Sequence, residues 1–98
     1  MTEYRFTWDP AKAAANFRKH GIAFEDAVAV FADPQRLTRQ DRIEGGEYRW
    51  QTTGAIRQAT LVLVAHADSD DAEVTFVRII SARLAARHER KSYERKDG

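Results

Sequence analysis

The first part of the chain changes from a two-residue to a helical hydrophobic period. Residues 4–8 alternate apolar and polar side chains, which predicts a half-buried strand. Asp9-Pro10 is typical of a helix N-cap followed by the first helical residue, and Gly21 is typical of a C-cap. We therefore predict a helix from Pro10 to about His20. The side chains expected on its buried face are Ala13, Ala14 and Phe17.

A second helix is predicted from about Phe24 to Ala32, and Asp33-Pro34 ends it. Its buried face should carry Phe24, Ala27, Val28 and Phe31.

The remaining pattern is that of a sheet followed by one helix. The predicted elements are a weak polar strand at 36–42, a glycine turn at 45–46, a strand at 48–53, a break at 54–58, a buried strand at 59–66, an acidic turn at 68–71, a buried strand at 74–81 and a final helix. Ser81 would cap this helix, whose apolar side would carry Leu84, Ala85, His88 and Tyr93.

The predicted order is β-α-α-β-β-β-β-α, and 98 residues suffice for a single domain over 1–98. Short connections between the last four strands favour an antiparallel meander. The class is therefore α+β, with helices packed on a mainly antiparallel sheet. The partner of the first strand does not follow from the pattern.

Composition narrows the possible classes of protein. The longest apolar run, Leu61 to Ala65, is too short to span a membrane. No secretory leader is recognisable and there are no cysteines, so we expect a cytoplasmic protein without disulfides. Three histidines occur without metal-binding spacing, so we expect no metal or other cofactor.

Charge is distributed unevenly although the net charge is only +1. Six Lys/Arg fall between Arg83 and Lys96, whereas four acids and no base fall between Asp68 and Glu73. Each segment alone is typical of a solvated helix or turn. A basic end can also bind the phosphates of a nucleic acid.

The residues of this chain resemble the BrnT toxin family. The match extends in order and spacing from about Tyr4 to Tyr93. It rests on Trp8-Asp9-Pro10 with Lys12 and Asn16, Lys19 to Phe24, Val30 to Pro34, Glu47-Tyr48-Arg49-Trp50 leading to Gly54, Leu61 to His66, Arg78 to Arg83, Glu89-Arg90 and Tyr93.

This resemblance implies a RelE/ParE-like fold and a ribonuclease toxin that arrests translation. It also implies a BrnA-like antitoxin that carries the DNA-binding function, so that promoter DNA is bound only through the antitoxin. Two departures are Ala23, where a capping serine is common, and Gln58-Ala59, which replaces a glycine-containing turn and leaves the position of Arg57 open.

RNA can be cut without a metal when its 2′-hydroxyl attacks the adjacent phosphorus, provided that cations and acid–base groups assist. We predict Arg83 as the cation for the scissile phosphate, because a guanidinium matches phosphate oxygens. Glu89 would orient Arg83 or accept the 2′-hydroxyl proton; a surface ion pair is the structural alternative. His20 and Lys19 complete the predicted catalytic set, although cations also stabilise a helix C-terminus.

Three further residues are predicted to bind RNA. Arg57 lies in a turn, Arg87 in the basic segment, and Tyr93 on the helical face of Glu89, where its ring could stack on a base or pack on the sheet. His66 is more typical of a core histidine with one hydrogen bond, and Arg78 must either pair internally or open onto a cleft.

Two functions of different class follow. The favoured one is an endoribonuclease toxin held inactive by its antitoxin. The alternative is a non-catalytic interaction protein of the same fold, acting like relatives that inhibit DNA gyrase or as a co-repressor with the antitoxin.

Overall fold

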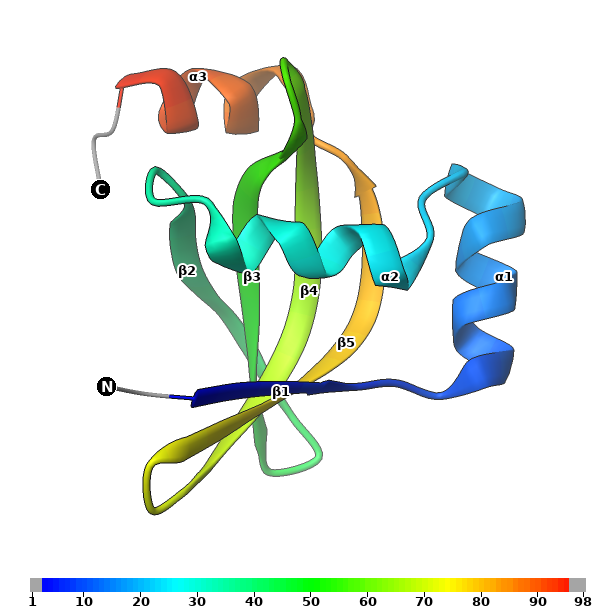
Figure 1. Ribbon diagram of the computed structural model, residues 1–98, viewed down its shortest axis with the longest axis vertical. Helices are drawn as coiled ribbons and strands as arrows, with labels where there is room; N and C mark the ends of the chain where they lie inside the picture. Colours follow the sequence, from blue (N-terminus) through cyan, green and yellow to red (C-terminus); the bar gives the residue numbers. More distant parts are fainter. Residues whose placement is uncertain (1–2, 96–98) are drawn as a thin grey trace.

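A computed structural model describes residues 3–95 as one five-stranded sheet with helices around it (Figure 1). Lys96, counted above in the basic segment, lies outside the described residues. The elements are β1 (Glu3–Thr7), α1 (Pro10–His20), α2 (Phe24–Ala27), the 3-10 helix η1 (Val28–Ala32), β2 (Leu37–Glu44), β3 (Glu47–Arg57), β4 (Thr60–Asp71), β5 (Val74–Leu84) and α3 (Arg87–Arg95).

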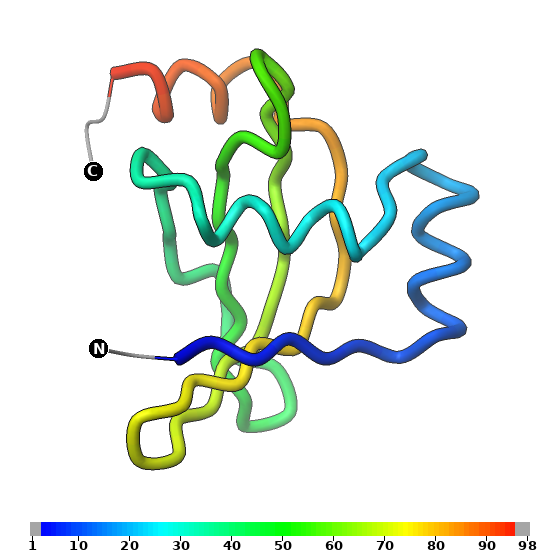
Figure 2. The backbone as a smooth tube through the Cα atoms, viewed as in Figure 1, coloured from blue at the N-terminus to red at the C-terminus, as the bar shows by residue number. Residues whose placement is uncertain are grey.

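The sheet has the order β1-β5-β4-β3-β2. Strands β2 to β5 form the predicted antiparallel meander, which confirms the α+β class and the element order. β1, whose partner was left open, pairs in parallel with the first half of β5, with Phe6 opposite Val77. The backbone trace shows β1 crossing in front of the other strands, below α2 and η1 in this view (Figure 2).

The main core lies between the sheet and the segment formed by α2 and η1. Phe24, Ala27 and Val30 are fully buried there against the sheet. The sheet side of this core consists of Val62, Val64, Val77, Ile79 and Ala82. Because side chains alternate across a strand, neighbouring residues such as Leu63 and Arg83 lie on the opposite face.

α1 begins and ends as the sequence predicts, with Asp9 as N-cap and Gly21 as a left-handed C-cap at φ 73°. The prediction of its buried face was wrong for Ala14 and Phe17, since Phe17 is 55% exposed, whereas Ala13 is partly buried against the core and Asn16 is buried. The Asn16 amide donates to the carbonyls of Ile22 (3.1 Å) and Ala82 (2.9 Å) and accepts from the Ala82 N–H (3.1 Å). α1 therefore covers the second half of β5, where β1 no longer pairs with it.

The second predicted helix consists of two parts. Only Phe24–Ala27 is α-helical, and Val28–Ala32 is a 3-10 helix. The tighter 3-10 turn brings Val30, which was not predicted to be buried, into the core, and leaves Val28 and Phe31 half-buried.

Two predicted interruptions of the sheet were also wrong. β3 continues through the expected break at 54–58 as far as Arg57, and β4 continues through the acidic stretch as far as Asp71. Alanines turn the chain after each strand, with left-handed φ values of 64° at Ala59 and 55° at Ala72. A sequence prediction that expects glycine at turns therefore misses both of them.

The start of the final helix was predicted too early. Ser81 and Leu84 belong to β5, and α3 begins only at Arg87. Glu89 accepts a hydrogen bond from the Ala86 N–H at 2.7 Å, the contact that an acidic third helical residue makes with the residue capping a helix. This glutamate fixes the start of α3 in place of a capping hydroxyl.

Candidate active site

A pocket of about 60 Å³ lies between α3 and the face of the sheet opposite the core. α3 lies across the end of the sheet where β5 stops, at the top of Figure 1. The residues lining the pocket are Leu37, Arg39, Gln51, Thr53, Leu63, His88, Glu89 and Ser92. They combine one cation, one imidazole and one carboxylate with an apolar floor.

Arg83 and Glu89 meet beside this pocket in a bidentate ion pair. Arg83 Nη1 and Nη2 donate to the two Glu89 carboxylate oxygens, each at 2.9 Å. The hydrogen bond from Arg83 holds the pKa of Glu89 below its usual value, and the same bond raises the pKa of Arg83. Arg83 is thus a permanently charged, oriented guanidinium, with 37% of its side chain open to solvent.

Tyr93 anchors the other end of α3. Its hydroxyl donates to Asp33 Oδ2 at 2.6 Å, and Asp33 also accepts from the N–H groups of Ala55 and Gln35, both at 2.8 Å. Burial raises the pKa of Asp33, but these donors outweigh it and the net pKa is lowered. The bond to Asp33 raises the pKa of Tyr93 to about 12. The phenol therefore holds α3 against the end of η1.

Lys19 and His20 occupy the last turn of α1. Within residues 3–95, no described polar contact joins either side chain to Arg83 or Glu89. Arg57 ends β3 and lies 3.5 Å from Asp26 across an exposed ion pair. Arg87 is the exposed first residue of α3. The structure thus brings Arg83 and Glu89 together, and the roles of all these residues remain predictions.

Arg39 and His88 are pocket residues that the sequence analysis did not select. Arg39 lies on β2 opposite Gln51 of β3. The His88 side chain is 81% exposed, and its Nε2 lies 3.8 Å from Glu89 Oε2. The two-residue period of β2 places Arg39 on one face with Leu37. That signal was present but gave no reason to prefer this arginine to its neighbours.

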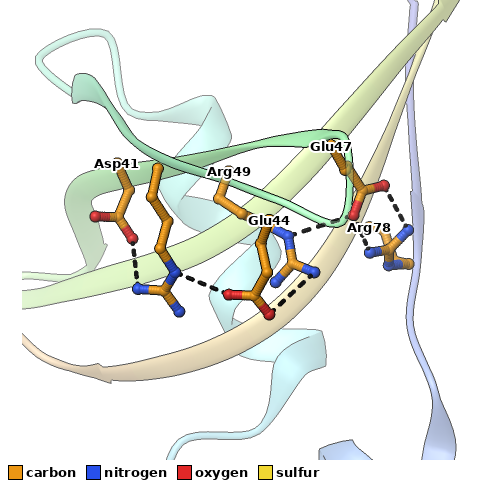
Figure 3. A network of polar contacts seen from close by, with 6 residues as sticks. Asp41, Glu44, Glu47, Arg49 and Arg78 are labelled. Carbon is orange, nitrogen blue, oxygen red and sulfur yellow. Dashed lines mark hydrogen bonds and ion pairs between the residues drawn. The ribbon is translucent and has the colours of Figure 1, made fainter.

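Ion pairs neutralise most of the arginines at the other end of the sheet. Figure 3 shows this charged network, in which Arg78 donates to both oxygens of Glu47, at 3.0 and 2.7 Å. Of the two alternatives for Arg78, internal pairing or opening onto a cleft, the structure shows internal pairing. The other members are Asp41, Arg42, Glu44 and Arg49.

Uncompensated positive charge lies at the α3 end instead. In the described part of the chain, Arg39, Arg87, Arg90 and Lys91 have no acidic partner. An anion at the pocket would therefore meet free cations, whereas an anion at the network of Figure 3 would meet neutral pairs.

His66 is buried within a chain of hydrogen bonds on the core side. Its Nδ1 lies 2.6 Å from Asp68 Oδ1, its Nε2 lies 2.7 Å from the Thr52 hydroxyl, and Thr52 lies 2.9 Å from the Thr38 hydroxyl. With Asp68 ionised, Nδ1 donates and Nε2 accepts. Because His66 and Thr52 are at most 2% exposed, the middle of this series of hydrogen bonds is closed to solvent, as expected for a histidine of the core.

Residues 3–95 contain no group of three histidine, aspartate or glutamate side chains placed to hold a metal ion. No helix within the same range is long and apolar enough to cross a membrane.

Comparison with known proteins identifies one family. The model of the family described as "Ribonuclease toxin, BrnT, of type II toxin-antitoxin system" matches residues 8–89. The crystal structure of the Brucella abortus ribonuclease toxin BrnT is similar in fold, with a TM-score of 0.60 and 22% sequence identity, over 88% of this chain and 100% of that one. No match was found among the curated proteins.

Proposed function

The chain belongs to the BrnT ribonuclease toxins of type II toxin–antitoxin systems. From this premise we propose that it cuts RNA in the cytoplasm and needs no metal to do so. We propose further that a BrnA-like antitoxin neutralises it. The observation that carries the proposal is the pocket under α3, where Glu89 and His88 face Arg39 and Arg83 stands beside them. Cleavage would arrest translation, on free or ribosome-bound RNA.

The proposed reaction is an internal transesterification. The 2′-oxygen of the ribose bonds to the adjacent phosphorus and loses its proton to a base, the bond from phosphorus to the 5′-oxygen breaks, and the departing oxygen takes up a proton. The products are a 2′,3′-cyclic phosphate and a 5′-hydroxyl, and no water is consumed.

Arg83 and two of the pocket side chains each suit one part of this reaction. The Arg83 guanidinium is held in a fixed orientation by Glu89, so it can stabilise the extra negative charge on phosphorus without reorganising. Arg39 would supply a second positive charge from the sheet. His88 is exposed and carries an imidazole, the side-chain type that most often serves as a general acid or base.

RNA reaches the pocket along α3, whose cations Arg87, Arg90 and Lys91 have no acidic partner among the described residues. Lys19 and His20 remain predicted catalytic residues, and Arg57 remains a predicted RNA contact. Tyr93 is proposed to act by holding α3, since its hydroxyl already binds Asp33.

The test is incubation of antitoxin-free protein with a defined RNA in EDTA, followed by mapping of the cut ends. We expect 2′,3′-cyclic phosphate ends, and a loss of about 10²-fold in rate for Arg83→Lys, which keeps the charge but not the fork. Arg78→Lys is the matched control, because Arg78 also binds a carboxylate in bidentate fashion but at the neutralised end of the sheet. Intact RNA at every protein concentration, with and without ribosomes, would exclude the enzyme and favour the non-catalytic alternative.

A further inference from the structure

An apolar groove separates β1 from η1 on the core side of the sheet. Its volume is about 200 Å³. Figures 1 and 2 show both segments crossing the front of the sheet, with β1 below η1. The β1–η1 groove is lined by Tyr4, Phe6, Val28, Phe31 and Ala32.

The floor of the groove is a row of aromatic rings. Tyr4 stacks on Phe6 with ring centres 6.4 Å apart, and Phe6 lies 5.2 Å from Phe31. Tyr4 is nevertheless 43% exposed, although a strand in a small domain normally turns such a ring inward. Rigid aromatic side chains in an apolar recess are typical of the central contacts of protein interfaces.

The β4–β5 hairpin lies beside this groove, because Thr75 and Val77 of β5 are the register partners of Tyr4 and Phe6, and we call its acids Asp68, Asp70, Asp71 and Glu73 the acidic rim. Asp68 binds His66, whose ring packs edge-on against Phe31 with centres 4.9 Å apart. Asp70 accepts a hydrogen bond from Thr75, the register partner of Tyr4. The backbone carbonyl of Glu73 accepts from the Glu3 N–H at 2.9 Å, next to Tyr4.

These rim carboxylates are not neutralised. Within residues 3–95, no lysine or arginine forms an ion pair with Asp68, Asp70, Asp71 or Glu73. This contrasts with the Figure 3 network at the same end of the sheet, where each acid has an arginine partner. A polyanion such as RNA is repelled here, and a basic polypeptide is attracted.

β1 also has a free backbone edge. It is the first strand in the sheet order, and β5 occupies its only paired side in the described structure. An extended segment can bind such an edge through main-chain hydrogen bonds while placing alternate side chains in a neighbouring groove.

We propose that the β1–η1 groove and its acidic rim bind the antitoxin through a segment that combines basic and apolar side chains. The inference rests on the antitoxin part of the proposed function and is independent of RNA cleavage. It places inhibitor docking and RNA cutting on opposite faces of the sheet, since Thr53 and Leu63 of the pocket point away from the core that Phe31 adjoins.

The experiment measures affinity of the purified cognate antitoxin for matched variants by calorimetry at low and high salt. Tyr4→Ser should weaken binding by about tenfold or more, as removal of a central aromatic contact does. Phe17→Ser is its control, because Phe17 is an exposed ring on α1, 55% exposed against 43% for Tyr4. Glu73→Lys should weaken binding at low salt and flatten its salt dependence, whereas Glu94→Lys on α3 should not.

Each variant is first checked for an unchanged thermal midpoint and for RNA cleavage in the absence of antitoxin. Absence of cleavage in all variants alike would refute the proposed activity. The affinities for the antitoxin would still test the docking site, because they are measured separately. Wild-type affinity in both Tyr4→Ser and Glu73→Lys, or a larger loss in Phe17→Ser, would overturn the docking site. So would a dimer of this chain alone that Tyr4→Ser dissociates, because a second copy would then occupy the groove.

Discussion

The hydroxyl of Tyr93 lies 2.6 Å from Asp33 Oδ2, a contact that joins α3 to the end of η1 across 60 positions of sequence. The same oxygen accepts the Ala55 N–H, so one carboxylate connects η1, β3 and α3. Because His88 and Glu89 lie on α3, the shape of the pocket depends on this carboxylate as well as on the Arg83–Glu89 pair.

Tyr93→Phe should destabilise the fold without removing the ring. The hydrogen bond has a charged acceptor, so its loss should cost about 1.5 kcal/mol of unfolding free energy at pH 7. Urea unfolding followed by circular dichroism measures this. Tyr48→Phe is the control, because no hydrogen bond of its hydroxyl is described and the ring is 54% exposed; equal losses in both variants would contradict the anchoring role.

The same pair predicts how stability depends on pH. The folded pKa of Tyr93 is raised from 10 to about 12, so its contribution is complete below pH 10 and is lost as pH rises through 12. The folded pKa of Asp33 is lowered from 3.8, so its contribution is present above that value and is lost as pH falls through the lowered one. The stability difference between wild type and Tyr93→Phe should therefore disappear at both extremes. A pH series of unfolding curves tests this, and a constant difference would refute it.

Glu89→Gln tests whether the ion pair orients Arg83 for catalysis. Glutamine can still accept from the Ala86 N–H, so α3 should keep its start. RNA cleavage should fall by about tenfold or more because the guanidinium loses its charged partner. Glu47→Gln, which breaks the other bidentate pair, should leave the cleavage rate unchanged. Equal rates in the two variants would remove Glu89 from the proposed site.

Asn16→Ala should be strongly destabilising for an alanine substitution on a helix. It removes three hydrogen bonds to backbone groups of Ile22 and Ala82, and buried groups left unpaired cost about 1–3 kcal/mol each. Ala15→Asn/Asn16→Ala is a control that returns the amide one position away, where it cannot reach Ala82. Recovery of the thermal midpoint in that double variant would contradict the specific role of residue 16.

The sequence predicted the elements better than it predicted their ends. Period and capping located α1, because Asp9, Pro10 and Gly21 act locally. The ends of β3, β4 and β5 depend on pairing with neighbouring strands, which holds polar stretches such as 68–71 in the sheet. Phe17 was assigned to the core because no local signal shows that Asn16 is needed to bind the edge of β5.

The candidate site was predictable only where its residues are close in sequence. The spacing of six between Arg83 and Glu89 suggested their contact as one of two roles for Glu89, and the structure shows this contact as a bidentate pair, a geometry that was not predicted. Arg39 comes from a strand 49 positions before His88, and only the sheet order brings both to one pocket. Asp33 was read as a helix end, although its main contacts are with Ala55 and Tyr93.

The two histidines on the surface provide the sharpest test of where catalysis occurs. His88 lines the pocket with Glu89, whereas His20 ends α1 and has no described polar contact with Arg83 or Glu89 within residues 3–95. If the pocket is the site, His88→Ala should lower single-turnover RNA cleavage by about 10²-fold and remove one limb of its pH–rate profile. His20→Ala should change the rate much less and keep both limbs. The reverse result would move acid–base catalysis to the end of α1, as the sequence first predicted, and would leave the pocket with a binding role only.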